Sequence, residues 1–412
     1  MGGRKMLCQF TVKNYKSIRD EMTLDMQASS ISEHNDRVII EPDGQVFLPV
    51  SAIYGPNGGG KSNVLEALQT LDTKILRPVQ AARQNSLMNY KLSRFPVKPF
   101  SFSEESKDQP TEFEVFFRTK TAEYRYILHI HQENILYEKL DRIRFETSRR
   151  SALFERKNGI IELKGTFSKL KISEGLSDSL PLLSYLAITY MSNETVKDIM
   201  DWFESGIDFL NYGNPLEELR TAVASSEEIK NLVLEMIREM DLDIEDYRIE
   251  ERDKSIEVYT SHVVNGYREE LSLSEESSGT QKLFSLLPFI AKSLLMGTTL
   301  VIDELDAKIH PVLLKHIIMM FNNREINRFG SQLIFTSHDL STMNSEVFRR
   351  DEIWFVAKGN DQNSKLYSLV EFKSANGEII RKDAKYDKQY LEGKYGADPY
   401  LRKIIDWREI GA

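Results

Sequence analysis

A glycine-rich octapeptide at residues 55–62 has the residue types needed to hold a phosphate group. It reads Gly-Pro-Asn-Gly-Gly-Gly-Lys-Ser and fits the pattern G-x-x-x-x-G-K-[ST]. Glycines let successive backbone amides point inward around a phosphate, Lys61 supplies a cation, and the Ser62 hydroxyl can bind Mg²⁺. The pattern predicts a nucleotide site, here called the phosphate loop, formed by Gly55, Asn57, Gly58, Gly59, Gly60, Lys61, Ser62 and the following Asn63.

Two carboxylates follow an apolar segment at residues 300–302, where Leu-Val-Ile leads directly into Asp303 and Glu304. In enzymes with a phosphate loop, an Asp after a buried strand holds Mg²⁺ and an adjacent Glu can polarise the attacking water. Alone, such a pair is more often part of a solvated loop. Together with the phosphate loop it predicts Asp303 as a metal ligand and Glu304 as a catalytic base.

The elements predicted around these residues alternate between strand and helix. Period-two alternation or a short apolar run predicts strands over 7–18 and 48–54, and three- and four-residue spacings predict a helix over 62–71. Segments 112–130 and 135–145 are rich in aromatic and β-branched residues and predict an antiparallel sheet. Helical periodicity then covers 180–240, and alternating helices and strands return at 279–295, 300–302, 311–321 and 332–336. The sequence predicts an α/β fold with a helical insertion.

Composition excludes several classes of protein. The 412 residues are 41% hydrophobic and 28% charged, which is typical of a folded chain and not of a disordered or fibrous one. The single Cys8 allows no internal disulfide and no cysteine-based zinc site, so we expect a cytoplasmic location. No apolar segment approaches the ~20 residues that cross a bilayer, and we expect neither a signal peptide nor a membrane partner.

Charge is unevenly distributed along the chain. The net charge is −9, while residues 201–276 carry 7 basic and 21 acidic side chains, a net −14, and residues 139–171 carry 10 basic and 4 acidic, a net +6. Solvated faces are the favoured interpretation of both segments over partner surfaces.

Ser-Ser-Gly-Thr-Gln at residues 277–281 opens a predicted helix, and here the sequence resembles the ABC-type ATPases. Ser278 and Gly279 match the central Ser-Gly of their signature motif, whereas Thr280 replaces the usual second glycine. A Ser-Gly at a helix N-terminus can bind an anion, although alone it is more often a helix cap. The resemblance implies that ATP is the nucleotide and that Ser278, Gly279 and Gln281 cover the ATP held by another subunit.

Two further matches follow in the order of the same family. Asp306 takes the D-loop position, and residues 332–339 resemble the strand that ends in the switch histidine, here His338. The resemblance implies a γ-phosphate sensor at His338, whereas a lone histidine would be interpreted as a cap. His310, before Pro311, is expected to have a structural or dimer-contact role.

The opening at residues 14–18, Asn-Tyr-Lys-Ser-Ile, resembles that of the soluble RecF, SMC and OLD-type ATPases. The lack of long coiled coils counts against SMC proteins, and the expected end at residue 412 leaves no room for a Toprim nuclease domain. Segments 349–355 and 390–400 resemble compact ATPase subunits of bacterial abortive-infection and phage-defence systems of the AbiL, RloA and PARIS type.

The resemblance implies an ABC-type P-loop ATPase head with a mixed-sheet N-lobe and a parallel-sheet core. We expect an N-lobe with the phosphate loop and an antiparallel sheet over 1–175, and a mainly helical acidic insertion over 176–270. A C-lobe over 271–412 would hold the signature, the Walker B carboxylates, the D-loop and the switch histidine.

The expected function is ATP hydrolysis across a subunit interface, with Lys61, Glu304 and His338 as catalytic residues and Mg²⁺ on Ser62 and Asp303. The partners would be a second copy or a larger homo-oligomer, a separately encoded effector such as a nuclease, and a phage-encoded trigger. One alternative is a RecF-like DNA-scanning ATPase whose DNA groove is lined by residues 139–171. Another is a nucleotide-gated scaffold without hydrolysis, suggested by Thr280.

Overall fold

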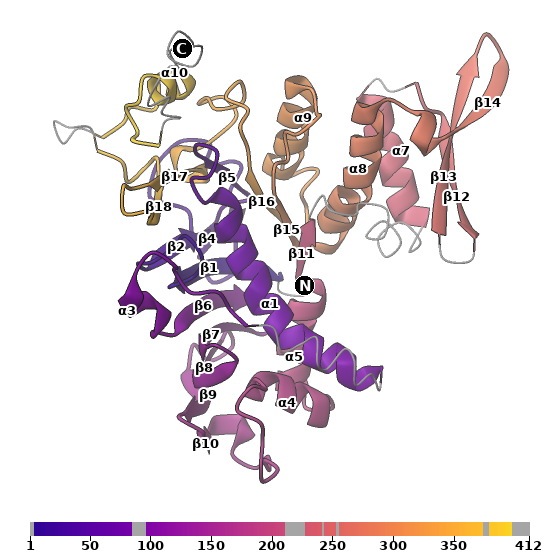
Figure 1. Cartoon of the computed structure of the whole chain (residues 1–412). Coiled ribbons are helices and arrows are strands. Elements are labelled where there is room, and N and C mark those ends of the chain that lie inside the picture. The colour runs from indigo at the N-terminus through magenta and orange to yellow at the C-terminus, as the bar shows by residue number, and fades with distance from the viewer. Residues whose placement is uncertain are drawn as a thin grey trace, which may run out of the picture.

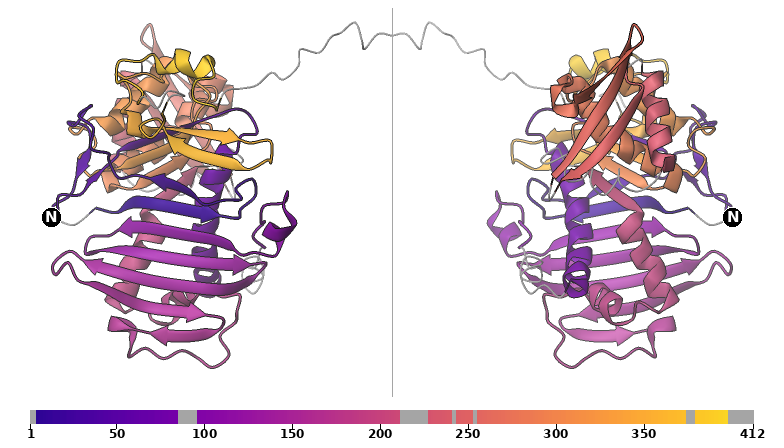
Figure 2. Two further views of the ribbon diagram at one scale, coloured as in Figure 1. Left: turned by 90° about the vertical axis from the view of Figure 1, so that its left-hand side faces the viewer. Right: turned by 90° about the vertical axis from the view of Figure 1, so that its right-hand side faces the viewer.

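The computed structural model describes residues 4–84, 96–210, 227–240, 243–252, 255–373 and 379–397 (Figure 1). Two large sheets organise this part of the chain, one above the other in the views of Figure 2. The seven-stranded sheet is antiparallel throughout, in the order β10-β9-β8-β7-β6-β1-β2. Its strands are β1 (Met6–Lys13), β2 (Met22–Asp25), β6 (Thr111–Arg118), β7 (Ala122–His131), β8 (Asn134–Arg144), β9 (Arg150–Lys157) and β10 (Ile160–Leu163).

The six-stranded sheet has the order β11-β15-β16-β5-β17-β18, and all its pairs are parallel except β17 with β18. Every residue of β5, β15 and β16 is buried, as expected for a parallel sheet covered on both faces. The strands are β5 (Val50–Tyr54), β11 (Ile207–Leu210), β15 (Thr299–Ile302), β16 (Gln332–Thr336), β17 (Ile353–Lys358) and β18 (Ser364–Ser368).

Alternate residues of this parallel sheet enter two different cores. Ile53, Val301 and Ile334 belong to a core shared with the antiparallel sheet and with helix α1 (Lys61–Arg83). Their neighbours, such as Leu300 and Leu333, belong to a second core with α7 (Glu227–Glu239), α8 (Ser278–Met296) and α9 (Pro311–Asn322). The predicted α/β fold, with an antiparallel lobe and a parallel core, is confirmed.

The segment over 176–270 does not form the single, mainly helical insertion that we expected. Its first part, α4 (Leu182–Thr189) and α5 (Glu194–Ser205), packs against α1, and β11 then joins the parallel sheet. Its last part is a three-stranded antiparallel ribbon beside α7 and α8, made of β12 (Asp246–Arg252), β13 (Ser255–Val264) and β14 (Tyr267–Ser272) (Figure 1). Asn265 and Gly266, both at positive φ, turn the chain between β13 and β14, which is the hairpin signal that helical periodicity obscured.

The remaining elements are short. They are β3 (Ile39–Ile40), β4 (Val46–Phe47), α3 (Glu104–Lys107), α10 (Tyr386–Leu391) and the 3₁₀ turns η1 (Gly165–Phe167), η2 (Leu273–Glu275) and η3 (Arg350–Glu352). The expected division at 175 does not separate the two sheets, because β5 lies inside the parallel sheet. Residues 211–226 of the acidic segment and 398–400 of the closing segment lie outside the described residues. None of the helices described combines the length and apolar character required to cross a membrane.

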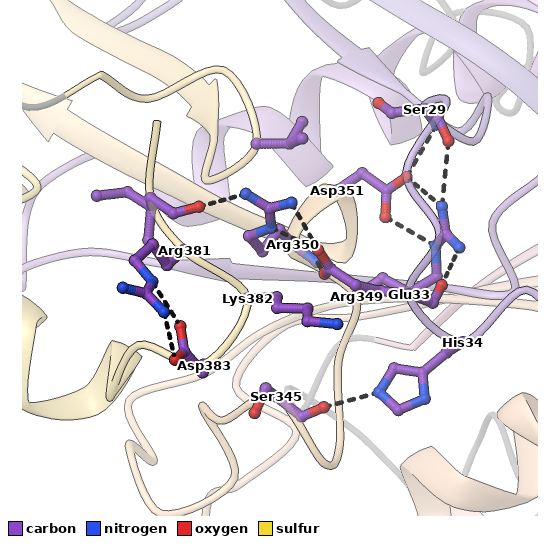
Figure 3. A network of polar contacts seen from close by, with 12 residues as sticks. Ser29, Glu33, His34, Ser345, Arg349, Arg350, Asp351, Arg381, Lys382 and Asp383 are labelled. Atoms are coloured by element: carbon purple, nitrogen blue, oxygen red, sulfur yellow. Dashed lines mark hydrogen bonds and ion pairs between the residues drawn. The ribbon is translucent and has the colours of Figure 1, made fainter. Parts of the chain in front are cut away.

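A buried ionic network holds the segment around Glu33 against the chain that leads into β17 (Figure 3). Arg349 is 1% exposed, pairs with Asp351 through two hydrogen bonds of 2.9 and 2.8 Å, and donates to the Ser29 carbonyl oxygen at 3.2 Å. Arg350 donates to Glu33 at 2.7 Å. These contacts fix a long connection that has little regular structure of its own.

Glu352, next to this network, is completely buried and only its Oε2 accepts a hydrogen bond, from the Arg349 amide at 2.8 Å. Burial raises the pKa of Glu352 from 4.5 to about 8. Between these values the folded protein keeps a proton that the unfolded chain has lost, so the free energy of unfolding should fall as pH rises.

We expect Glu352→Gln to reduce the fall in the free energy of unfolding between pH 6 and pH 8, measured by urea unfolding at both pH values. The exposed Glu346→Gln is the control, and equal slopes in the wild type and Glu352→Gln would contradict the assignment.

The aromatic cluster beneath the antiparallel sheet gives a second test of the fold. Trp202 of α5 is 1% exposed and stacks on Phe117 of β6 with ring centroids 4.3 Å apart. Trp202→Ala should lower the free energy of unfolding by about 3–5 kcal/mol, because it leaves a cavity. Ile160→Ala, at a side chain that is 71% exposed, should change it by less than about 0.5 kcal/mol. Similar effects of the two substitutions in urea unfolding would contradict this packing.

Candidate nucleotide-binding site

The phosphate loop connects the end of β5 to the first turn of α1, as the sequence predicts. Its conformation requires glycine at two places where other chain segments approach closely. A Cβ on Gly55 would collide with the Val356 carbonyl oxygen of β17, and one on Gly60, at φ 108°, would collide with Ser364. The loop is therefore shaped by the neighbouring strand as well as by its own sequence.

Lys61 is buried beneath the loop. Its Nζ donates to the carbonyl oxygens of Gly55 at 2.9 Å and Pro56 at 3.3 Å. Burial lowers the pKa of Lys61, and the carboxylates of Asp303, Glu304 and Asp306 oppose this shift. The ammonium group thus lies between the loop and the carboxylates, where it can exchange its carbonyl partners for phosphate oxygens.

Two serines that the sequence analysis did not assign support the loop. Ser364 Oγ donates to the Gly59 carbonyl oxygen at 2.7 Å and contacts Ser17 Oγ at 2.8 Å. The Asn63 side chain, expected to contact the nucleotide, instead donates to Ser17 Oγ at 2.7 Å. Ser17 lies in the 14–18 segment that was used only as a family resemblance, whereas Ser364 had no signal in the sequence.

The acidic pair follows β15, two strands from the loop-bearing β5. Thr336, at the end of the intervening β16, donates to Asp303 Oδ1 and accepts a hydrogen bond of 2.7 Å from the Glu304 amide. Glu304 is exposed and has a φ of 51°. One threonine hydroxyl, which sequence reasoning missed, therefore orients the Asp303 carboxylate and holds the backbone of Glu304.

Asp306 and His338 also meet at this edge of the sheet. Asp306 Oδ2 accepts a hydrogen bond of 3.1 Å from the His338 amide, and the His338 side chain remains exposed. His310 is the N-cap of α9, and its Nδ1 accepts a hydrogen bond from the Val312 amide at 3.3 Å. This contact agrees with the structural role that was one of two expectations for His310.

The signature segment at residues 277–281 forms the first turn of α8. Ser277 is the N-cap and accepts from the Thr280 amide at 3.1 Å, and the Thr280 hydroxyl lies 2.9 Å from Ser277 Oγ. Gln281 donates to the Glu276 carbonyl oxygen at 2.8 Å, so its side chain holds the turn together. The Ser278 side chain is exposed. Thr280, which replaces the usual glycine, thus stabilises the N-terminal cap of α8 through its contacts with Ser277.

A buried lysine links the signature helix to the acidic turn. Burial lowers the pKa of Lys282 to about 7, while Asp306 and Glu304 act in the opposite direction. A Cβ on Gly279 would lie 3.5 Å from the Lys308 carbonyl oxygen, so the start of α8 packs beside the same turn. The signature segment therefore packs next to the turn after β15.

Four of the ten basic side chains in the 139–171 segment form ion pairs within the described part of the antiparallel lobe. Lys139 and Arg150 lie 3.3 and 3.6 Å from Asp141. Arg156 lies 3.0 Å from Asp178, and Lys164 lies 3.2 Å from Glu155 and 3.0 Å from Glu162. Three of the four acidic partners belong to the same segment, so these pairs leave most of its positive charge excess in place, and the DNA-groove alternative stays a prediction.

A parallel sheet with a phosphate loop after a central strand and an acidic pair after a nearby strand defines an ABC-like P-loop protein of the ATPase class. Within that class, a family model described as "AAA domain, putative AbiEii toxin, Type IV TA system" matches residues 50–344, and the chain belongs to this family. A search of curated proteins gives no match to this sequence.

Solved SMC head domains are similar over most of the chain. An SMC head bound to the C-winged helix domain of ScpA is 14% identical with a TM-score of 0.44, and covers 88% of this chain and 97% of its own. The SMC head domain from Thermotoga maritima is 16% identical, with a TM-score of 0.42 and coverage of 88% and 98%. An SMC head with an extended coiled coil, bound to the C-terminal domain of ScpA derived from Pyrococcus furiosus, is 12% identical, with a TM-score of 0.43 and coverage of 88% and 96%.

The position of Thr336 leads to a prediction for the site. Thr336→Val leaves the Glu304 amide without an acceptor and Asp303 without its donor, which should cost about 1–3 kcal/mol of stability. Because the Asp303 carboxylate loses its orienting contact and the Glu304 backbone loses its anchor, the rate of phosphate release from ATP should fall by about tenfold to a hundredfold. Urea unfolding and phosphate release measure the two effects. Thr336→Ser keeps the hydroxyl and should restore both, and equal behaviour of the two variants would contradict the assigned role.

Proposed function

We propose that the protein binds and hydrolyses ATP between two copies of the chain and uses this cycle to control a separate effector. One observation carries the proposal. The phosphate loop, Asp303 with Glu304, and His338 follow the carboxyl ends of three adjacent parallel strands, so they meet at one edge of the sheet. Ligands of open α/β sheets bind at this edge.

Each group at the edge has a chemical role in this proposal. The loop amides and Lys61 bind the β- and γ-phosphates. Ser62 and Asp303 provide the hydroxyl and carboxylate oxygens that Mg²⁺ prefers, and the bound ion would neutralise charge on the phosphate oxygens. Glu304 removes a proton from the attacking water; its side chain is exposed and its backbone amide is held by Thr336. His338 contacts the γ-phosphate, with its backbone held by Asp306.

The exposure of the signature segment supports a shared site. Ser278 begins α8 and is exposed. The segment packs beside the turn after β15, where a Cβ on Gly279 would lie 3.5 Å from the Lys308 carbonyl oxygen. We therefore infer that Ser278 and Gly279 cover the ATP bound by a second copy, with Asp306 at the contact, in a dimer or a larger homo-oligomer.

The biological role that we propose is antiviral defence in the bacterial cytoplasm. The family description names a toxin of a toxin–antitoxin system, which supports an effector-linked role. In this proposal ATP holds the closed state and hydrolysis releases it, so that a separately encoded effector, a nuclease or toxin, is held or freed in response to a phage-encoded trigger. The acidic face of α7 and the ribbon would suit a basic effector.

The ATP-dependent closed state can be tested with Glu304→Gln, which removes the base but keeps the shape of the side chain. With ATP and Mg²⁺ its native mass should double or rise further, whereas Lys61→Ala, which loses the phosphate contact, should stay at the mass of one chain. Native mass spectrometry with and without nucleotide measures this difference. Purification with the products of neighbouring genes then identifies an effector retained in one nucleotide state. A Glu304→Gln protein that remains monomeric with bound ATP would overturn the shared-site mechanism.

A further inference from the structure

A cavity of about 260 Å³ lies at the edge of the parallel sheet opposite to the phosphate loop. Gly330, in its wall, comes two residues before β16 begins, whereas the phosphate loop follows the end of the parallel strand β5. These strands are five residues long, which corresponds to about 17 Å. The cavity is therefore distinct from the ATP site.

Four arginines converge on this cavity, which is here called the arginine cavity. Arg4 precedes β1, Arg37 precedes β3, and Arg324 and Arg328 follow α9. None of the residues lining the cavity is an aspartate or glutamate. Apolar side chains that include Ile39 and Phe321 complete the wall.

The hydrogen bonds of these arginines leave most of their charge without compensation. Arg37 donates to the carbonyl oxygens of Glu346 and Val347, both at 3.1 Å, and Arg328 donates to that of Glu325 at 2.7 Å. Arg324 donates to the Val38 carbonyl oxygen at 2.7 Å. Carbonyl oxygens orient a guanidinium group but carry no net charge. Among the described residues, Arg4 forms an ion pair with Glu41 3.5 Å away, and Arg37 acts electrostatically on the buried Glu352.

The walls of the arginine cavity are held in place before any ligand binds. The ionic network of Figure 3 fixes the segment that leads to Arg37, through the pair of Arg350 with Glu33 and a 2.7 Å contact between His34 and the Ser345 carbonyl oxygen. On the other side Gly330, at φ 72°, allows close approach, because a Cβ there would lie 2.7 Å from Arg4 Cδ. A preorganised site loses less entropy when a ligand binds.

We propose that the arginine cavity binds the phosphate groups of a small phosphate-bearing ligand. Guanidinium groups donate paired N–H bonds that match phosphate oxygens, and several of them favour an anion with more than one charge. The volume suits a molecule no larger than a mononucleotide, and the apolar wall can accept its uncharged part. This site is independent of the proposed hydrolysis at the phosphate loop.

The test is a calorimetric titration of the full chain with pyrophosphate, without nucleotide or Mg²⁺. We expect a binding event that persists in Lys61→Ala and weakens at least about tenfold in Arg328→Gln, as for loss of a charge-assisted contact. Arg328 suits this purpose because it donates to a carbonyl oxygen only three residues away, whereas Arg324 holds the chain at Val38. Arg381→Gln, at an exposed arginine paired with Asp383, is the matched control.

Absence of binding, loss in Lys61→Ala, or an equal loss in Arg381→Gln would overturn the proposal. Unchanged thermal unfolding of Arg328→Gln confirms that the variant is folded. A second titration compares adenosine, AMP and a 5′-phosphorylated oligonucleotide. Equal affinity for adenosine and AMP would also overturn phosphate recognition. Affinity that rises with oligonucleotide length would identify nucleic acid as the source of the phosphate, and affinity that is independent of length would identify a small molecule.

Discussion

The parallel pairing of β15, β16 and β5 is the constraint on which the rest of the site depends. Its register places Ile302 beside Phe335 and Thr336 beside Ile53, so the three strands end at nearly the same level. Hydrogen bonds continue past the strand ends, from the Leu305 amide to the Thr336 carbonyl oxygen at 3.1 Å and from the Ser337 amide to that of Ile53 at 3.1 Å. Groups that are hundreds of residues apart in the chain are thereby fixed relative to one another by backbone contacts.

Local patterns predicted the parts of the fold that local chemistry determines. The phosphate loop, its flanking strand and helix, and the apolar strand before Asp303 have short patterns that depend on neighbouring residues alone. The hairpin at Asn265 and Gly266 also had such a signal. The helical periodicity before it ends at Met240, but the predicted helical insertion was continued to residue 270. The prediction for the insertion was therefore wrong about where the helical pattern ends and the strand pattern begins.

The parts that were not predicted depend on contacts between distant segments. Thr336 and Ser364 are ordinary strand residues in the sequence, and their roles arise only because β16 lies between β5 and β15 and because β18 begins beside the phosphate loop. The basic segment over 139–171 gives a third example. Its charge excess is visible in the sequence, but the pairs of Arg150 with Asp141 and of Arg156 with Asp178 become apparent only when the strands and the following loop are assembled.

Helix α1 joins the two lobes, and its length has a mechanical consequence. The 23 residues from Lys61 to Arg83 form a rod about 35 Å long. Its first turn follows the phosphate loop, and at its other end Arg83 pairs with Glu204 of α5 at 2.7 Å. A tilt of about 5° at the first turn displaces the far end of such a rod by about 3 Å. A small change in the phosphate loop would thus displace the Arg83 end of α1, next to α5, by about the diameter of an atom.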